Sequence, residues 1–204
     1  MQFYNQTTYG IIILVLLGFL VAVKRTATGS ILEKPEGSPF LVVVNTFNLF
    51  FLLVANPLAS VMLIIRRVDA VDPSHLTIQS AWLVTGLEAG GMALCVAGYL
   101  LMAWALLSLR NNYQLGGNSP RLDDKMVING PYQLVRHPMY LAAVIISLGL
   151  ACLIQSLAYL SVFCIYLVLM IFLIPVEEER LLGAYGKQYL EYQRKVKRLV
   201  PGLY

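Results

Sequence analysis

Five long apolar stretches, separated by short polar segments, are the feature that most constrains this chain. They cover residues 9–23, 40–65, 81–109, 140–154 and 157–174 of 204. Hydrophobic residues make up 58% of the sequence and charged residues 13%, whereas a soluble domain carries about 45–50% and about 25%. So few charges cannot cover a water-facing surface, and the same composition excludes disorder. We therefore predict an all-α integral membrane protein with about five transmembrane helices.

Two short sequences, one inside a stretch and one between two stretches, predict how the helices are bent or connected. As a straight helix, residues 40–65 would be roughly 39 Å long against a hydrocarbon core of about 30 Å. Asn56-Pro57 lies within this stretch and predicts a kink. Only Gln155-Ser156 separates the last two stretches, which predicts a helical hairpin.

Basic residues are unevenly distributed over the loops that five spans would create. Of the 15 Lys and Arg residues, only Arg66 and Arg67 fall on one side. Cytoplasmic loops are enriched in Lys and Arg. We expect the N-terminus outside, with loop 110–136 and the C-terminus in the cytoplasm, in a prokaryotic inner membrane or the endoplasmic reticulum. This bias explains the net charge of +4, and no basic run with interleaved aromatic residues indicates nucleic-acid binding.

The C-terminal tail has a helical periodicity of its own. Apolar and aromatic residues recur at helical spacing, and most basic residues fall between them, which predicts an amphipathic helix at the cytoplasmic interface. Gly183 and Gly186 weaken this helix and predict a bend. The periodic residues are Leu181, Leu182, Tyr185, Tyr189, Tyr192, Val196 and Leu199.

Metal-binding and dinucleotide-binding patterns are missing from the sequence. His75 and His137 fall on opposite predicted sides, and the three cysteines all lie inside spans, so no metal site is expected. Gly90-Gly91 lies in an apolar helix rather than after a strand and indicates helix packing.

Arg136-His137-Pro138 introduces the fourth apolar stretch. Proline is favourable at the first helical position, and the residue before it is disfavoured in helical geometry. Arg136 and His137 should therefore lie at the mouth of a membrane helix, where free N–H groups attract an anion. An anchoring arginine and a capping histidine would explain this cluster equally well.

Glu177-Glu178-Glu179 follows Pro175 at the end of the fifth stretch. Acidic residues are favoured in the first turn of a helix, but three in a row at a membrane surface are unusual. The two clusters flank one predicted hairpin and so return to the same side, facing each other over a hydrocarbon-lined cavity. Such a site would suit a zwitterionic or cationic cofactor and a lipid-like second substrate.

Polar residues inside the spans have simpler explanations. Glu88 in the third span would place a charge inside the membrane, which is energetically unfavourable. It lies only about two helical turns from the outer surface, however, and we favour a packing or snorkelling role. Asn45, Asn48 and Asn56 in the second span are expected to be interhelical hydrogen-bond partners.

Two motifs flank the predicted hairpin. The first reads Val127-x-x-Gly130-x-Tyr132-x-x-x-Arg136-His137-Pro138-x-Tyr140, and the second reads Glu177-Glu178-x-x-Leu181-x-x-x-Tyr185-Gly186-x-x-Tyr189-x-x-Tyr192-x-x-x-Val196-x-Arg198-x-x-Pro201. Together they resemble the isoprenylcysteine carboxyl methyltransferase family, and phospholipid N-methyltransferases share much of the pattern. The first three spans carry no matching motif.

The resemblance implies a single membrane methyltransferase domain over residues 1–204, with 1–109 as a three-span scaffold and 110–204 as the catalytic half. It implies S-adenosylmethionine as cofactor and a lipid-like or prenylated acceptor. Arg136 and Arg198 would lie near the reacting end and hold an acceptor carboxylate. Ala142, where many members have glycine, would narrow the approach between helices. The implied cofactor-site residues are Gly130, Tyr132, His137, Pro138, Tyr140, Glu177 and Glu178.

The sequence does not decide which class of methyl acceptor the protein uses. Carboxyl O-methylation of an isoprenylcysteine-like substrate needs no general base, because a carboxylate is already nucleophilic. Phospholipid N-methylation or small-thiol S-methylation would require proton removal, for which Glu178 or Tyr140 would be the candidates. An NADPH-dependent sterol-type reductase and a non-enzymatic membrane protein are the competing hypotheses.

Overall fold

The computed structural model describes residues 3–35, 38–65, 67–114, 116, 118–121 and 123–200. Helices make up the regular structure of these residues, and β-type pairing among them is limited to two isolated bridges, His75–Ser156 and Val135–Lys197. The all-α prediction is thus confirmed. Arg66 and Pro201 lie outside the described residues.

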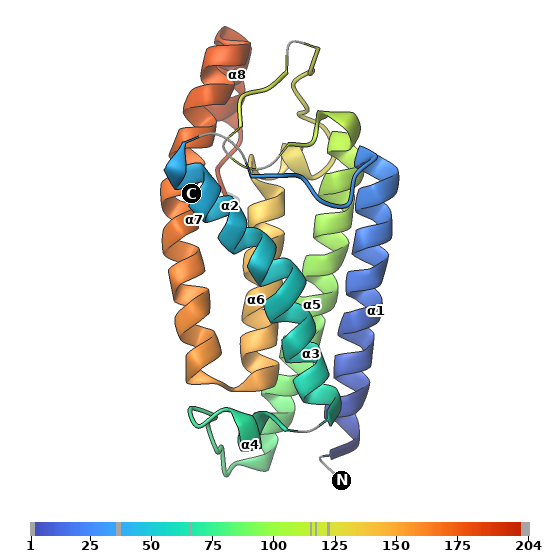
Figure 1. Cartoon of the computed structure of the whole chain (residues 1–204). Coiled ribbons are helices and arrows are strands. Elements are labelled where there is room, and N and C mark those ends of the chain that lie inside the picture. The colour runs from blue at the N-terminus through green and yellow to red at the C-terminus, as the bar shows by residue number, and fades with distance from the viewer. Residues whose placement is uncertain are drawn as a thin grey trace.

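A bundle of long helices forms the body of the molecule (Figure 1). Four are long and apolar enough to cross a membrane: α1, the continuous α2–η1–α3 segment, α5 and α7. The fifth apolar helix, α6, has 17 residues and is about 25 Å long. The bounds are α1 Phe3–Thr28, α2 Pro39–Phe50, η1 Phe51–Ala55, α3 Asn56–Ile65, α4 Val68–Val71, α5 Ala81–Leu109, η2 Arg110–Asn112, η3 Gly130–Gln133, α6 Pro138–Ile154, α7 Leu157–Tyr185 and α8 Lys187–Lys195.

The predicted irregularity in the second apolar stretch is a π-helical turn. Helix α2 begins at Pro39, with the Ser38 hydroxyl accepting the Leu41 N–H. Residues Phe51–Ala55 then widen into the π-helix η1, in which the Asn56 N–H bonds to the Phe51 carbonyl five residues back. This wide turn directly precedes Pro57, and such turns occur frequently at functional sites.

Helix α7 does not end at Pro175, so one interpretation of the glutamates is wrong. The helix continues to Tyr185 with an exposed Pro175 inside it. Glu177, Glu178 and Glu179 therefore lie within a continuous helix rather than in a first turn. Membrane helices tolerate proline because neighbouring groups satisfy the freed carbonyl.

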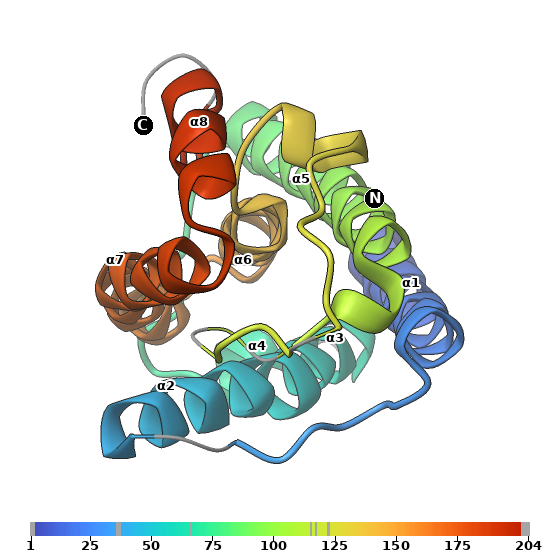
Figure 2. The same ribbon diagram turned by 90° about the horizontal axis from the view of Figure 1, so that it is seen from above.

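The tail is divided at Gly186, one of the two glycines at which a bend was predicted. This glycine has φ +54° and separates α7 from α8, whereas Gly183 remains inside α7. After α8 the chain is extended at Val196. Seen from above, α8 leads away from the end of α7 and lies beside α6 (Figure 2).

Helices α5 and α6 pack through glycines. A Cβ on Gly91 would lie 2.8 Å from the Gly149 carbonyl oxygen, and one on Gly149 would lie 2.6 Å from the Gly91 carbonyl oxygen. A Cβ on Gly98 would lie 3.0 Å from the carbonyl oxygen of Ala142, which is fully buried. Small residues allow such close backbone approach in membrane helices. Seen from above, α1 and α5 stand on one side of α6 and α7 on the other (Figure 2).

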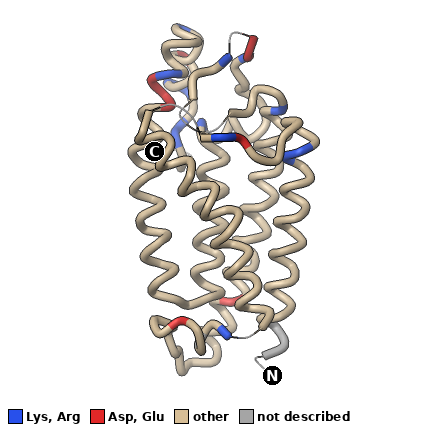
Figure 3. Tube along the Cα trace, viewed as in Figure 1, with Lys and Arg blue, Asp and Glu red and all other residues tan. Residues whose placement is uncertain are grey.

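Charged residues gather mainly at the end of the bundle that carries α8 and the loop before α6 (Figure 3). Arg67 directly precedes α4 at the opposite end (Figure 1), and Glu88, near the start of α5, is 2% exposed. This arrangement agrees with the charge bias from which the sidedness of the chain was predicted.

Candidate functional site

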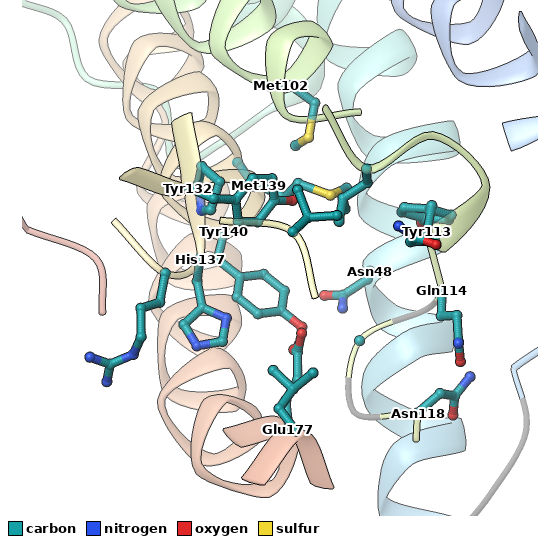
Figure 4. A pocket seen from close by; sticks show the side chains of 18 of the residues that line it. Asn48, Met102, Tyr113, Gln114, Asn118, Tyr132, His137, Met139, Tyr140 and Glu177 are labelled. Carbon is teal, nitrogen blue, oxygen red and sulfur yellow. The ribbon is translucent and has the colours of Figure 1, made fainter. Parts of the chain in front are cut away.

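A cavity of about 250 Å³ lies below the charged end of the bundle. This is just under the range of roughly 300–1,000 Å³ typical of small-molecule sites. Its lining comes from α2, η1, the first residue of α3, α5, α6, α7, α8 and the loop between α5 and α6. Polar groups such as Gln114, Asn118 and Glu177 line one part, and Met102 and Met139 line another (Figure 4).

Glu178 is the centre of a buried ion-pair cluster beside this cavity. One carboxylate oxygen, Oε1, accepts from Arg136 Nε at 2.8 Å and lies 2.6 Å from Arg136 Nη2. It also lies 3.3 Å from His137 Nε2. The other, Oε2, accepts from Arg198 Nε at 2.9 Å. The Glu178 side chain is 5% exposed and that of Arg136 is 8% exposed, so removing either partner would strand a buried charge.

Backbone hydrogen bonds bring the two motifs together. The Arg136 N–H donates to the Lys197 carbonyl at 2.8 Å, and the His137 N–H donates to the Arg198 carbonyl at 3.0 Å. Arg136 Nη1 adds hydrogen bonds to the carbonyls of Gln193, at 3.2 Å, and Val196. The segment after α8 is thus held against the N-terminus of α6, and Arg136 is a bridge between α7 and the end of α8.

Glu177 lies one residue earlier and has different surroundings. It lines the cavity, half-buried, and Oε2 accepts the Tyr140 hydroxyl at 2.6 Å. The rings of Tyr140 and His137 stack with centroids 5.5 Å apart. Figure 4 shows the Tyr140 hydroxyl directed at Glu177, with His137 beside it. Because consecutive helical residues point about 100° apart, Glu177 faces the cavity, Glu178 faces the arginines and Glu179 is exposed.

Two loop segments close the polar part of the cavity. Gly116 leaves no room for a Cβ beside the Tyr140 hydroxyl, and its carbonyl accepts from Asn45 Nδ2 at 3.0 Å. Tyr132, in η3, is buried, and its carbonyl accepts the Tyr192 hydroxyl at 2.5 Å. Burial, reinforced by the nearby Glu177 carboxylate, holds the pKa of Tyr132 well above its usual value. The phenol therefore stays protonated, as a hydrogen-bond donor, even at a pH where an exposed tyrosine ionises.

The predicted site residues fall into two groups. Arg136 and five of the implied cofactor residues line the cavity, whereas Gly130, Glu178 and Arg198 are not among its lining residues. Gly130 adopts φ +60° with Ser108 Oγ 2.6 Å from where its Cβ would be, so it shapes the turn. The guanidinium groups of Arg136 and Arg198 both form ion pairs with Glu178. The lining residues from the prediction are Tyr132, Arg136, His137, Pro138, Tyr140 and Glu177.

Sequence reasoning missed several lining residues. Tyr113, Gln114 and Asn118 come from the polar loop, where no motif marks them. Tyr189 also lines the cavity and belongs to the recognised motif without an assigned role. The three asparagines of the second apolar stretch line it as well, and their position inside a membrane span was the available signal.

A family model for phospholipid methyltransferases matches residues 87–188, which include the cavity-lining residues of α5, α6, α7 and the loop before α6, and most of the Glu178 cluster. The chain belongs to the phospholipid methyltransferase family. The four helices long enough to span a bilayer agree with an integral-membrane member of this family.

Two further likenesses extend this result. The cobalt-zinc-cadmium resistance protein CzcN of Cupriavidus metallidurans is 33% identical over 85 residues, which are 42% of this chain and 39% of that relative. The solved structure of the eukaryotic intramembrane Ras methyltransferase ICMT, isoprenylcysteine carboxyl methyltransferase, matches 92% of this chain and 74% of its own at a TM-score of 0.52 and 19% identity. The latter likeness shows that this methyltransferase family member shares the fold of ICMT.

Proposed function

We propose that this protein transfers a methyl group from S-adenosylmethionine to a lipophilic acceptor in the cavity, at the cytoplasmic face of the membrane. The observation that carries the proposal is the Glu177–Tyr140 pair beside His137, lining a cavity that also reaches apolar side chains within the helix bundle. A polar end and an apolar interior suit one charged and one lipid-like reactant.

The residues at the polar end fit this cofactor. S-adenosylmethionine carries a sulfonium and an ammonium cation, and Glu177 offers a half-buried carboxylate whose Oε2 is already oriented by Tyr140. When bound, the cofactor supplies an electrophilic methyl group. Tyr132, Pro138 and Tyr140 give the cavity an aromatic and apolar lining that excludes water from the reacting groups.

Arg136, His137 and Arg198 act in this proposal as positioning residues. Their shared partner Glu178 holds the start of α6 against α7 and the segment after α8. Three cationic or donating partners also make Glu178 a poor general base, because taking a proton would break the cluster. The proposed chemistry therefore relies on orientation and desolvation of the two substrates.

Two of the acceptor classes considered above are lipophilic and fit this proposal. An isoprenylcysteine-like carboxylate is suggested by the two-motif resemblance. A lipid amine is favoured by the occupied guanidinium of Arg136 and by the carboxylates of Glu177 and Asp124 in the cavity lining. Membership in a methyltransferase family favours either of these over a sterol-type reductase.

Ligand-dependent thermal unfolding of the purified protein tests the cofactor. We expect S-adenosylhomocysteine to raise the melting temperature and NADPH to leave it unchanged, because a ligand that binds the folded state stabilises it. Glu177→Gln should weaken S-adenosylhomocysteine at least tenfold, about 1.4 kcal/mol, while the exposed Glu179→Gln is the matched control. Stabilisation by NADPH alone, or equal losses in both variants, would contradict the proposal. Methyl transfer from labelled cofactor to a prenylcysteine, a lipid amine and a small thiol then identifies the acceptor.

A further inference from the structure

Asn56 is an unexplained polar group in the middle of the membrane-spanning region. It is 3% exposed, and its Oδ1 has no hydrogen-bond partner among the residues that the structure describes. Its side chain was expected to bond to another helix. Instead it lines the cavity, at the end of the π-helical turn.

Several residues that line the cavity together with Asn56 are apolar or already hydrogen-bonded. Leu52 and Ile146 are apolar, and the Ser147 hydroxyl donates to the Ala143 carbonyl at 2.7 Å. The ring of Phe51 stacks on Tyr166 with centroids 5.3 Å apart. An amide oxygen left without a donor in such an environment is costly, so a group that donates a hydrogen bond would be bound there with selectivity.

Asn56 lies well away from the proposed methyl-transfer position. On the same continuous helical segment, Asn45 bonds to Gly116, which lies against the Tyr140 hydroxyl. Asn56 follows Asn45 by eleven positions, roughly 15 Å along a helix axis. A ligand that spans this distance presents its reactive end near Glu177 and a second polar group near Asn56.

We propose that Asn56 is a specificity-determining residue for the methyl acceptor, and that the acceptor carries a hydroxyl or amide N–H in its lipophilic part, which donates to Asn56 Oδ1. This inference rests on the proposed function, because it assumes that the acceptor occupies the cavity. It distinguishes the acceptor from one with a plain hydrocarbon chain, whether the methylated head is an amine or a carboxylate.

Paired amphiphiles test the inference on the full-length protein. Dodecylamine and aminododecanol share head and length but differ by a hydroxyl at the far end of the chain, and dodecanoate and hydroxydodecanoate form the corresponding acidic pair. Dissociation constants are measured in the presence of S-adenosylhomocysteine for the wild type, Asn56→Leu and Asn48→Leu. For each protein, we take the ratio of the two dissociation constants within a pair. Comparing this ratio between proteins cancels the partitioning of the amphiphiles into detergent.

We expect the hydroxylated member of at least one pair to bind roughly tenfold better, relative to its partner, in the wild type than in Asn56→Leu. Asn48→Leu, which changes an amide nearer the charged end, should keep the wild-type ratio. Asn56→Ala provides the same comparison if leucine disturbs packing. Equal ratios in the wild type and the Asn56 variants, as expected if only water occupies this position, would overturn the inference.

Binding of S-adenosylhomocysteine separates this inference from the function on which it rests. The wild type and both Asn56 variants should bind it equally. A wild type that binds it but shows no hydroxyl preference contradicts only the role of Asn56. A wild type that does not bind it overturns the proposed function and this inference together.

Discussion

Helix α6 has two sides that are built differently. Toward α5, backbone meets backbone at Gly91, Gly98 and Gly149, with no room for a further methyl group. Toward α2 and α7, longer side chains such as Tyr140 and Tyr166 surround a cavity. The two sides of α6 thus have different roles. Glycines fix one side closely against α5, and the opposite side is left to line a ligand site.

The largest effect is expected from Glu178→Ala, on the cavity side. It leaves the buried Arg136 and its neighbour His137 without their carboxylate, which should lower the free energy of unfolding by about 3 kcal/mol and abolish methyl transfer. Chemical denaturation and labelled methyl transfer measure the two effects. Glu179→Ala, at an exposed neighbouring position, should change neither. A Glu178 variant of normal stability would show that the cluster does not hold the site together.

The glycine-packed side is tested by two adjacent substitutions on α5. Gly91→Ala places a Cβ 2.8 Å from the Gly149 carbonyl oxygen and should cost about 2 kcal/mol through overpacking. Gly90→Ala has open space around its Cβ and should stabilise the helix by about 0.5 kcal/mol. Thermal unfolding in detergent measures both. Equal effects would mean that α5 and α6 are not in close contact.

A smaller effect of opposite sign is expected from Asn56→Leu without ligand. Replacing an amide whose Oδ1 has no described partner with an apolar group of similar size should raise the free energy of unfolding by about 1 kcal/mol. Unfolding in the absence of acceptor tests this expectation. A loss of stability would instead indicate that Asn56 is a structural hydrogen-bond partner.

The smallest effect concerns pH at the hairpin turn, far from the cavity. Hydrogen bonds from the hydroxyls of Ser156 and Ser74 lower the pKa of Asp72 below its usual value. Stability from this group is therefore present above its unfolded pKa of about 4 and is lost as pH falls through the lower folded value. As the pH falls below about 4, the melting temperature of the wild type should approach that of Asp72→Asn. A constant difference across pH would contradict the assignment.

The sequence predicted the helices better than their contacts. The bounds 81–109 coincide with α5, and each of the other apolar stretches lies within helical structure, because long apolar runs have few alternatives in a membrane. The convergence of Arg136 with Glu178 followed from the hairpin. By contrast, the continuation of α7 through Pro175 was not predicted, because a proline that ends a helix and one that a membrane helix tolerates look identical in the sequence.

The different contacts that neighbouring charged residues make could also not be predicted from the sequence. Glu177 and Glu178 are adjacent and equally acidic, yet one faces the cavity and the other faces two arginines. Only the rotation of α7 relative to α6 decides which is which. The same limit applies to Asn56, because an asparagine bonded to another helix and one lining a cavity look identical in the sequence.

The pairing of residues 135–137 with 196–198 sets an order of events during biosynthesis. Arg136 needs the carbonyls of Gln193 and Val196, and Glu178 needs Arg198. While the ribosome is still adding residues before 193, all the long helices have been made but the ion-pair cluster lacks these partners. The membrane-embedded bundle can therefore be inserted before the ion-pair cluster forms, and the cluster stays incomplete until the segment after α8 has been made.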